Sequence, residues 1–320
     1  MLTSILKRGA IVALAVAGLS TAAFAQLELK IMAPASPGGG WDGTARSMQQ
    51  ALMASGIAKS VQVTNVTGAG GTIGLAQLIN AKGDGSQLMV NGFVMVGAIL
   101  LNKSPVNLSQ TTPIARLTAE ALVIVVPTDS PIKTAKDLAE RVKADLAKVT
   151  WAGGSAGGAD HILAALFTEA AGGDAKKINY IPFSGGGEAL AAMLGGRVTA
   201  GISGYGEFEG QIKAGKLRVV GVSSSARLAN APDAPTLKEG GVNVELINWR
   251  SVVAPPGLSA EQTKTLSEAI AKLVKTKEWA EILKARGWDD AYLGGAEFAA
   301  FMTAEQARVS KVMTDVGLVK

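Results

Sequence analysis

Two stretches of sequence decide the fold: LKIMAPASPGGGWDGTARSMQQAL (29–52) and VTWAGGSAGGADHILAALFTEA (149–170). Each begins with a short apolar run and continues through a glycine-rich loop, an acidic residue and a segment with helical spacing. The pattern predicts a strand, a tight loop and a helix, repeated about 120 residues apart. Two further segments, at 66–79 and 181–194, also place several glycines just before a helix. Repeated units of this kind predict an α/β fold.

The rest of the chain continues this alternation. Apolar runs predict strands at 27–33, 61–66, 87–92, 121–127, 149–153, 178–182, 197–203, 217–224 and 248–255. Thr134-x-x-Asp137 and Ser259-x-x-Gln262 predict capping boxes, which satisfy unpaired N–H groups where a helix begins. From about Ser259 the chain is almost entirely helical, so we expect this tail to pack against an earlier part of the molecule.

Composition excludes several classes of protein. The chain has 320 residues with 31 Lys+Arg, 26 Asp+Glu, one His and no Cys. Without cysteine there is no disulfide, thiolate nucleophile or cysteine metal site, and His161 alone excludes two-histidine metal sites. With 48% hydrophobic and 18% charged residues, the chain is neither disordered nor a nucleic-acid-binding tail. We expect no metal, no cofactor and no nucleic-acid partner.

The first 25 residues predict a secretory signal peptide. Lys7 and Arg8 precede the apolar run IVALAVAGL (11–19), and Ala23-Phe24-Ala25 forms a small-x-small cleavage site. The run is shorter than the ~18 residues that a membrane-spanning helix needs. The remaining 295 residues, 26–320, are long enough for two lobes. We therefore expect an exported protein.

The glycine-rich loops are candidate anion-binding sites. Glycine lets a ligand approach the backbone closely, and the first turn of a helix presents unpaired N–H groups and partial positive charge. Tight turns that need positive φ explain a single loop equally well. Four such loops together favour a ligand site.

Three motifs suggest other chemistries. Gly38-x-Gly40-x-x-Gly43 matches a dinucleotide fingerprint, but the acidic residue expected after the next strand is absent from VQVTNVTG (61–68). Gly153-x-Ser155-x-Gly157 matches the nucleophile elbow of serine hydrolases, with His161 only six residues further on. This leaves an exported serine hydrolase using Ser155 as an alternative. A third candidate, the carboxylate pair Glu207 and Glu209, is expected to be solvated.

A family resemblance rests on six motifs in one order: PASPGGGWDGTAR (34–46), GAGGTIG (68–74), WAGGSAGGADH (151–161), FSGGGEALAAMLGGRV (183–198), SGYGEFEGQIKAGKLRVVGVSSSARL (203–228) and WRSVVAPPGLS (249–259). They resemble the extracytoplasmic solute-binding proteins of tripartite tricarboxylate transporters, the Bug family. The GGGWD form of the first loop is similar to the tricarboxylate-binding branch.

The resemblance implies an α/β, two-lobed periplasmic binding protein of type II, with the ligand in a cleft between the lobes. It assigns residues 26–125 and 250–320 to lobe 1 and residues 126–249 to lobe 2. It further implies a monomer without catalytic activity. Such a protein captures a small carboxylate, here a tricarboxylate such as citrate, and delivers it to the membrane permease subunits of the transporter. The alternatives are another dicarboxylate or an aromatic carboxylate as ligand, and a sensor kinase as partner.

Family members hold a ligand carboxylate largely through backbone N–H groups of the first two loops. Carried over, this implies ligand-binding residues in four loops and after the seventh strand: Ser36, Gly38, Gly39, Gly40, Trp41, Asp42, Thr72, Ser155, Gly157, Gly158, Asp160, His161, Ser184, Ser203 and Tyr205. Several roles stay open. Trp41 lines the pocket or packs in the core, and His161 contacts ligand or bonds structurally. Asp42 and Asp160 are expected to cap helices, with Asp160 alternatively anchoring a water. Arg250 pairs a second ligand carboxylate or links the lobes.

Overall fold

The computed structural model describes residues 27–184 and 186–320, so the expected signal peptide lies outside the described residues. The strands are β1 (Leu27–Ala33), β2 (Ala58–Asn65), β3 (Gln87–Gly92), β4 (Thr112–Pro127), β5 (Thr150–Gly153), β6 (Asn179–Pro182), β7 (Ala200–Gly204), β8 (Leu217–Val222), β9 (Ile247–Ala254) and β10 (Asp289–Gly294). The α-helices are α1 (Gly40–Ala54), α2 (Thr72–Asn80), α3 (Phe93–Leu101), α4 (Ala135–Ala144), α5 (Ala159–Ala170), α6 (Gly186–Leu194), α7 (Tyr205–Lys213), α8 (Ala260–Leu273), α9 (Lys277–Arg286) and α10 (Gly295–Asp315). Short 3₁₀ turns lie at Ala69–Gly71, Leu108–Gln110, Leu146–Lys148 and Ala175–Lys177.

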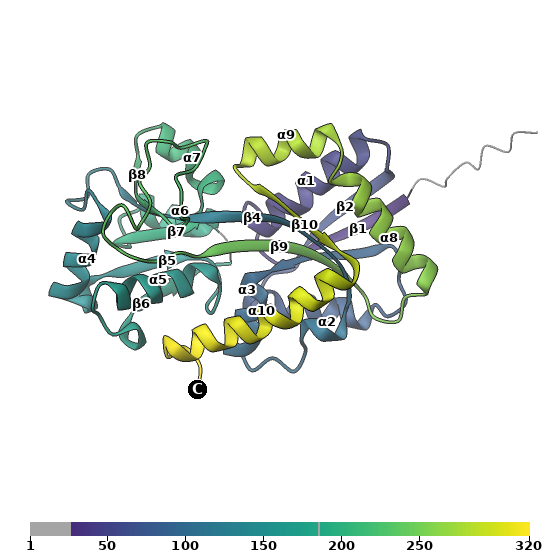
Figure 1. Ribbon diagram of the computed structural model, residues 1–320, viewed down its shortest axis with the longest axis horizontal. Coiled ribbons are helices and arrows are strands. Elements are labelled where there is room, and N and C mark those ends of the chain that lie inside the picture. The colour runs from purple at the N-terminus through teal and green to yellow at the C-terminus, as the bar shows by residue number, and fades with distance from the viewer. Residues whose placement is uncertain (1–26, 185) are drawn as a thin grey trace, which may run out of the picture.

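One long strand joins two halves of the molecule. The strands follow the order β2-β1-β3-β9-β4-β7-β5-β6, with β10 and β8 also paired to β4. The first part of β4, up to Ala121, pairs with β9 and β10, whereas Leu122 to Pro127 pair with β7 and β8. Figure 1 shows β4 and β9 running side by side between a group of elements on the left and one on the right. The predicted two-lobed α/β fold is confirmed.

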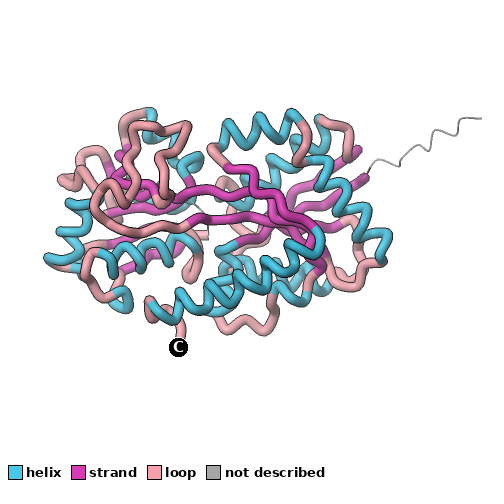
Figure 2. The backbone as a smooth tube through the Cα atoms, viewed as in Figure 1, coloured by secondary structure: helices cyan, strands magenta, loops and turns pink. Residues whose placement is uncertain are grey.

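The two long strands are the connections between the lobes, as the tube in Figure 2 makes plain. β4 changes its partners between Ala121 and Leu122, four residues before the lobe boundary expected at 125/126. That boundary stays a prediction. The helical tail packs back on earlier elements, as expected: α10 lies against α3 and β4. Beyond α10, Val316 packs with Ala165 and Ala175 of the other lobe.

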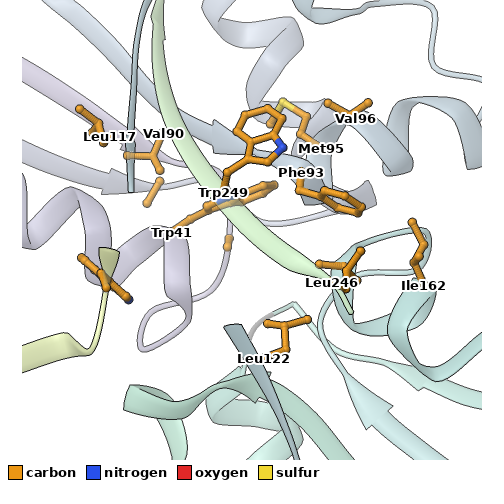
Figure 3. Packing of buried hydrophobic residues seen from close by; sticks show 14 of the residues in the cluster. Trp41, Val90, Phe93, Met95, Val96, Leu117, Leu122, Ile162, Leu246 and Trp249 are labelled. Atoms are coloured by element: carbon orange, nitrogen blue, oxygen red, sulfur yellow. The ribbon is translucent and has the colours of Figure 1, made fainter. Parts of the chain in front are cut away.

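The hydrophobic core extends from the first lobe to the cleft. Trp41, at the start of α1, is 6% exposed and belongs to a buried cluster with Phe93, Met95 and Trp249. Figure 3 shows these side chains gathered beside β9, with Leu122 and Leu246 further along towards the second lobe. Burial of such large apolar side chains contributes about 1.5–3 kcal/mol each. The first glycine loop is therefore anchored by the residue that follows it.

Two differences from the expected elements have simple causes. β4 begins at Thr112 rather than 121, because Arg116, Thr118 and Glu120 interrupt the apolar pattern of its first half. β10 was not expected at all, because DDAYLG (289–294) carries no apolar run. Both expected capping boxes are confirmed, at Thr134/Asp137 and at Ser259/Gln262. Across the described ranges, no helix combines the length and apolar character that crossing a membrane requires.

Candidate functional site

Two neighbouring cavities lie where the lobes meet. The first, of about 480 Å³, is lined by Ala35, Gly40, Trp41, Val94, Leu122, Gly154, Ser155, Asp160, Ser184, Gly186, Ser203, Gly204, Glu207, Asn248 and Arg250; we call it the charged cavity. The second, of about 680 Å³, is lined by Pro34, Ala35, Gly68, Ala69, Gly70, Gly71, Asn102, Ser155, Ala156, Pro182, Phe183, Ser184 and Glu188; we call it the glycine cavity. Ala35, Ser155 and Ser184 line both, so the two cavities form one cleft.

The glycine-rich loops converge on this cleft. Residues 34–41 and 153–160, far apart in the sequence, both contribute to the charged cavity. Residues 68–71 and 182–184, together with Glu188, join them around the glycine cavity. The amide of Ser36 donates to the carbonyl of Ser184 at 3.4 Å, which ties the first lobe to the second across the cleft.

Each of the first two loops already holds a carboxylate of the protein itself. The amide of Gly38 donates to Oδ2 of Asp42 at 3.0 Å, and the amide of Gly154 donates to Oδ2 of Asp160 at 2.6 Å. The residues that precede the helices, Gly39 and Gly158, have no side chain to cap them, and these aspartates satisfy the loops instead. One amide of each loop is therefore already taken by a carboxylate of the protein itself.

The two aspartates differ in electrostatic environment. Although burial raises it, hydrogen bonds from Arg46, Gly38 and Asn65 hold the pKa of Asp42 below its usual value. Asp160 is 8% exposed, and its burial raises the pKa of the carboxyl to about 7, against the lowering effect of the Gly154 amide. Asp160 lines the charged cavity, so its protonation state affects any ligand there.

A buried ion cluster stands at the wall of the charged cavity, which Arg250, Asn248 and Glu207 line and which Glu120 supports from behind. Arg250 on β9 pairs through Nη2 with Oε1 of Glu120 on β4, and the same oxygen accepts from Nδ2 of Asn248 at 3.2 Å. Glu207, on α7 of the second lobe, lies 3.8 Å from Nη2 of Arg250. Burial raises the pKa of Glu207 to about 8, partly offset by the positive charge of Arg250. The cluster contains more carboxyl groups than cations.

Comparison with known proteins identifies a family. A family model described as "Tripartite tricarboxylate transporter family receptor" matches residues 44–318. The chain belongs to this family.

Individual relatives agree with the assignment. The receptor is 28% identical to Protein BugT of Bordetella pertussis over 294 residues, 90% of this chain and 89% of the relative. The structure of the periplasmic binding protein BugD has a TM-score of 0.83 and 25% identity, covering 91% of this chain and 98% of BugD. MatC of Rhodopseudomonas palustris, solved with bound malate, has a TM-score of 0.79 and 22% identity, covering 90% and 99%.

Family members are solute-binding receptors that work with membrane transporter subunits. The prediction that the chain is not an enzyme is thus confirmed, and the hydrolase alternative is wrong. The geometry of the receptor gives the physical reason. Nδ1 of His161 accepts the amide hydrogen of Gly157 at 3.0 Å, and its ring stacks on Tyr180 at 4.2 Å. Burial lowers the pKa of His161 to about 4, so the ring is a neutral structural group and a poor base.

Six of the expected residues line the charged cavity: Gly40, Trp41, Ser155, Asp160, Ser184 and Ser203. Trp41 has both of the roles considered for it, because it lines the cavity and packs in the core. Whether these residues contact a ligand stays a prediction.

Other expected residues have bonds within the protein. The amide of Gly39 donates to Ser36, that of Gly158 to Ser155, and the hydroxyl of Thr72 to the carbonyl of Ala69. The amides of Gly38 and Gly157 donate to Asp42 and His161, respectively. Asp42 and Asp160 accept loop amides without being the residues that cap their helices. Tyr205 packs with Phe208 and Met193 and lines a different cavity, together with Ile212 and Leu217.

Sequence reasoning missed Glu120, Asn248 and Glu207. Glu207 was expected to be solvated, which is wrong: its side chain is 14% exposed, whereas Glu209 pairs with Lys213. A usable signal was present for Glu120 and Arg250, because charged residues inside buried apolar strands are normally paired. Arg250 approaches Glu207 of the second lobe, in keeping with the lobe-linking role considered for it, and its pairing with a ligand carboxylate stays a prediction.

Proposed function

We propose that this chain is a periplasmic receptor that captures a small carboxylate in the cleft and delivers it to membrane subunits of a tripartite transporter. The observation that carries the proposal is that loops about 120 residues apart in sequence line one cavity between the lobes. We further propose that the chain is exported through its first 25 residues and acts as a monomer.

The cleft contains donors suited to a carboxylate. The serines at 155 and 184 line both cavities, and Nη1 of Arg250 is buried without a hydrogen-bond partner among the described residues. Hydrogen bonds to charged groups contribute about 1.5–3 kcal/mol each. Micromolar affinity requires about 8 kcal/mol net, which a few such bonds supply. Ligand contacts from both lobes favour the closed state, the physical basis of recognition by the permease.

The charge of the cleft bears on the size of the anion. Asp160 and Glu207 line the charged cavity beside Arg250, whose guanidinium is already paired with Glu120, so a trianion such as citrate meets two carboxyl groups at this wall. We therefore favour an acid with fewer negative charges over a tricarboxylate. The malate bound to MatC, a protein of the same fold, is a dicarboxylate.

A thermal-shift screen followed by calorimetry tests the proposal. The panel contains citrate, malate, succinate, glutarate and the amino acids L-aspartate and L-glutamate. A ligand at 100 times its dissociation constant adds about 2.7 kcal/mol to the free energy of unfolding. Ser155→Ala should weaken binding about 3- to 10-fold by removing one hydrogen bond. Ser109→Ala, on an exposed surface turn, is the matched control. Failure of every acid at millimolar concentration would contradict the proposal.

A further inference from the structure

We propose that the wall of the charged cavity receives a protonated amine, so that the solute is an amino acid rather than a simple organic acid. The inference rests on the proposed function and specifies which class of carboxylate the receptor takes. It is drawn from the charge of the wall and from its unpaired polar atoms.

The charge of the wall calls for a cation. Three carboxyl groups, those of Glu120, Asp160 and Glu207, share one guanidinium. Arg250 pairs directly with Glu120, whereas the distance from its Nη2 to Oε1 of Glu207 is longer, at 3.8 Å. Burial raises the pKa of Asp160 to about 7 and that of Glu207 to about 8, so ionising them without a counter-charge is costly. An ammonium group beside them removes that cost.

Unpaired atoms of the wall give the second, independent observation. Arg250 and Asn248 are 4% and 6% exposed, and both donate to the same oxygen of Glu120. Nη1 of Arg250 and Oδ1 of Asn248 are nevertheless buried without a partner among the described residues. Oε2 of Glu207 likewise has no hydrogen-bond partner among the described residues, although the Ser203 hydroxyl lies close to this carboxyl group. Buried polar atoms of this kind each cost about 1–3 kcal/mol when unpaired.

Oδ1 of Asn248 and Oε2 of Glu207 each need a hydrogen-bond donor from the ligand, and Nη1 of Arg250 needs an acceptor. An ammonium has three N–H donors, enough for Glu207 and Asn248, and a carboxylate accepts from Arg250. An amino acid carries both groups. An ionised dicarboxylate has acceptors only, so it leaves Oδ1 of Asn248 unpaired, bonds to Glu207 only while that carboxyl keeps its proton, and adds negative charge to the wall.

Glycines hold the carboxyl groups in place. A Cβ at Gly204 would lie 2.5 Å from Oε2 of Glu120, and a Cβ at Gly186 would overlap Oε2 of Glu207. Both carboxyl groups therefore rest directly on backbone, which fixes their positions. A preformed acidic wall of this kind selects its ligand with little reorganisation.

The test compares acids that differ only in the amino group. Calorimetry at pH 7.5 measures L-aspartate against succinate, L-glutamate against glutarate, and L-phenylalanine against 3-phenylpropionate. We expect at least one amino acid to bind 10-fold or more tightly than its partner. Glu207→Gln should reduce that ratio at least 5-fold and tighten the binding of the acid without the amine. Glu209→Gln, on the same helix but paired with Lys213, should leave the ratio unchanged.

The outcomes separate this inference from the proposed function. If acids bind but their amino partners bind no better, the inference is wrong and the carboxylate receptor stands. If binding favours an amino acid but Glu207→Gln leaves the affinity ratio of the pair unchanged, the wall does not recognise the amino group. That outcome overturns the inference as well. If no member of any pair binds, the inference is wrong, and the proposed function fails as well only if citrate and malate do not bind either.

Discussion

Gly40 and Arg250 lie in direct contact: a Cβ placed on Gly40 would overlap Nη2 of the guanidinium. Gly40 begins α1 within the first glycine loop, and Arg250 is on the strand β9 that joins the lobes. This glycine is needed for the close approach of a buried cation. The loop and the ion cluster are consequently one structural unit.

Gly40→Ala should therefore displace Arg250 from Glu120. We expect a loss of about 1–3 kcal/mol in the free energy of unfolding, from overpacking, together with weaker ligand binding. Urea denaturation and calorimetry measure the two effects. Gly210→Ala is the matched control, because a Cβ on Gly210 in α7 has no atom within 4 Å and alanine favours a helix. Equal stability of Gly40→Ala and wild type would show that the guanidinium moves without cost.

The Arg250–Glu120 pair should show strong coupling. Removing one partner of a buried pair leaves an uncompensated charge, so Glu120→Ala should cost about 3–5 kcal/mol. In Glu120→Ala/Arg250→Met the unpaired charge is gone, and we expect the double variant to be at least 1 kcal/mol more stable than additivity predicts. The exposed pair Lys59–Glu28 is the comparison cycle, with coupling below about 1 kcal/mol. Additive effects within 0.5 kcal/mol at Arg250–Glu120 would contradict the prediction.

Stability of the ligand-free protein should fall as pH rises from 6.5 to 8.5. The unfolded chain loses the protons of Asp160 and Glu207 near their ordinary pKa values of 3.8 and 4.5, whereas the folded chain keeps them until about 7 and 8. The folded state therefore binds more protons over this range, and the free energy of unfolding decreases by about 1–3 kcal/mol. His161 opposes this trend slightly: its folded pKa is about 4, whereas the unfolded imidazole, with its ordinary pKa of 6.5, still binds protons near pH 6.5.

Urea denaturation at pH 6.5, 7.5 and 8.5 measures this slope. Glu207→Gln and Asp160→Asn should each flatten it, because an amide does not titrate. A flat profile in the wild-type protein would mean that water reaches both carboxyl groups.

The sequence predicted the convergence of the loops but not the ion cluster. The repeated strand–loop–helix unit is a local pattern, so β1 and the start of α5 follow from spacing and glycine content alone. The pairing of Arg250 with Glu120 depends on strand register, which a single sequence does not reveal. In the sequence alone, nothing distinguishes Glu207 from Glu209. Because α7 is a helix, side chains two positions apart differ by about 200° in direction around the helix axis. Glu207 therefore points into the protein, whereas Glu209 points outward.

The position of β9 also governs how the chain assembles. In the sheet, β9 lies between β3 and β4, although it follows β3 by more than 150 residues in the sequence. Until residues 247–254 are available, β3 and the first half of β4 each present an open edge, which invites pairing with other chains. A fragment that ends before Ile247 should accordingly aggregate rather than fold into an independent lobe.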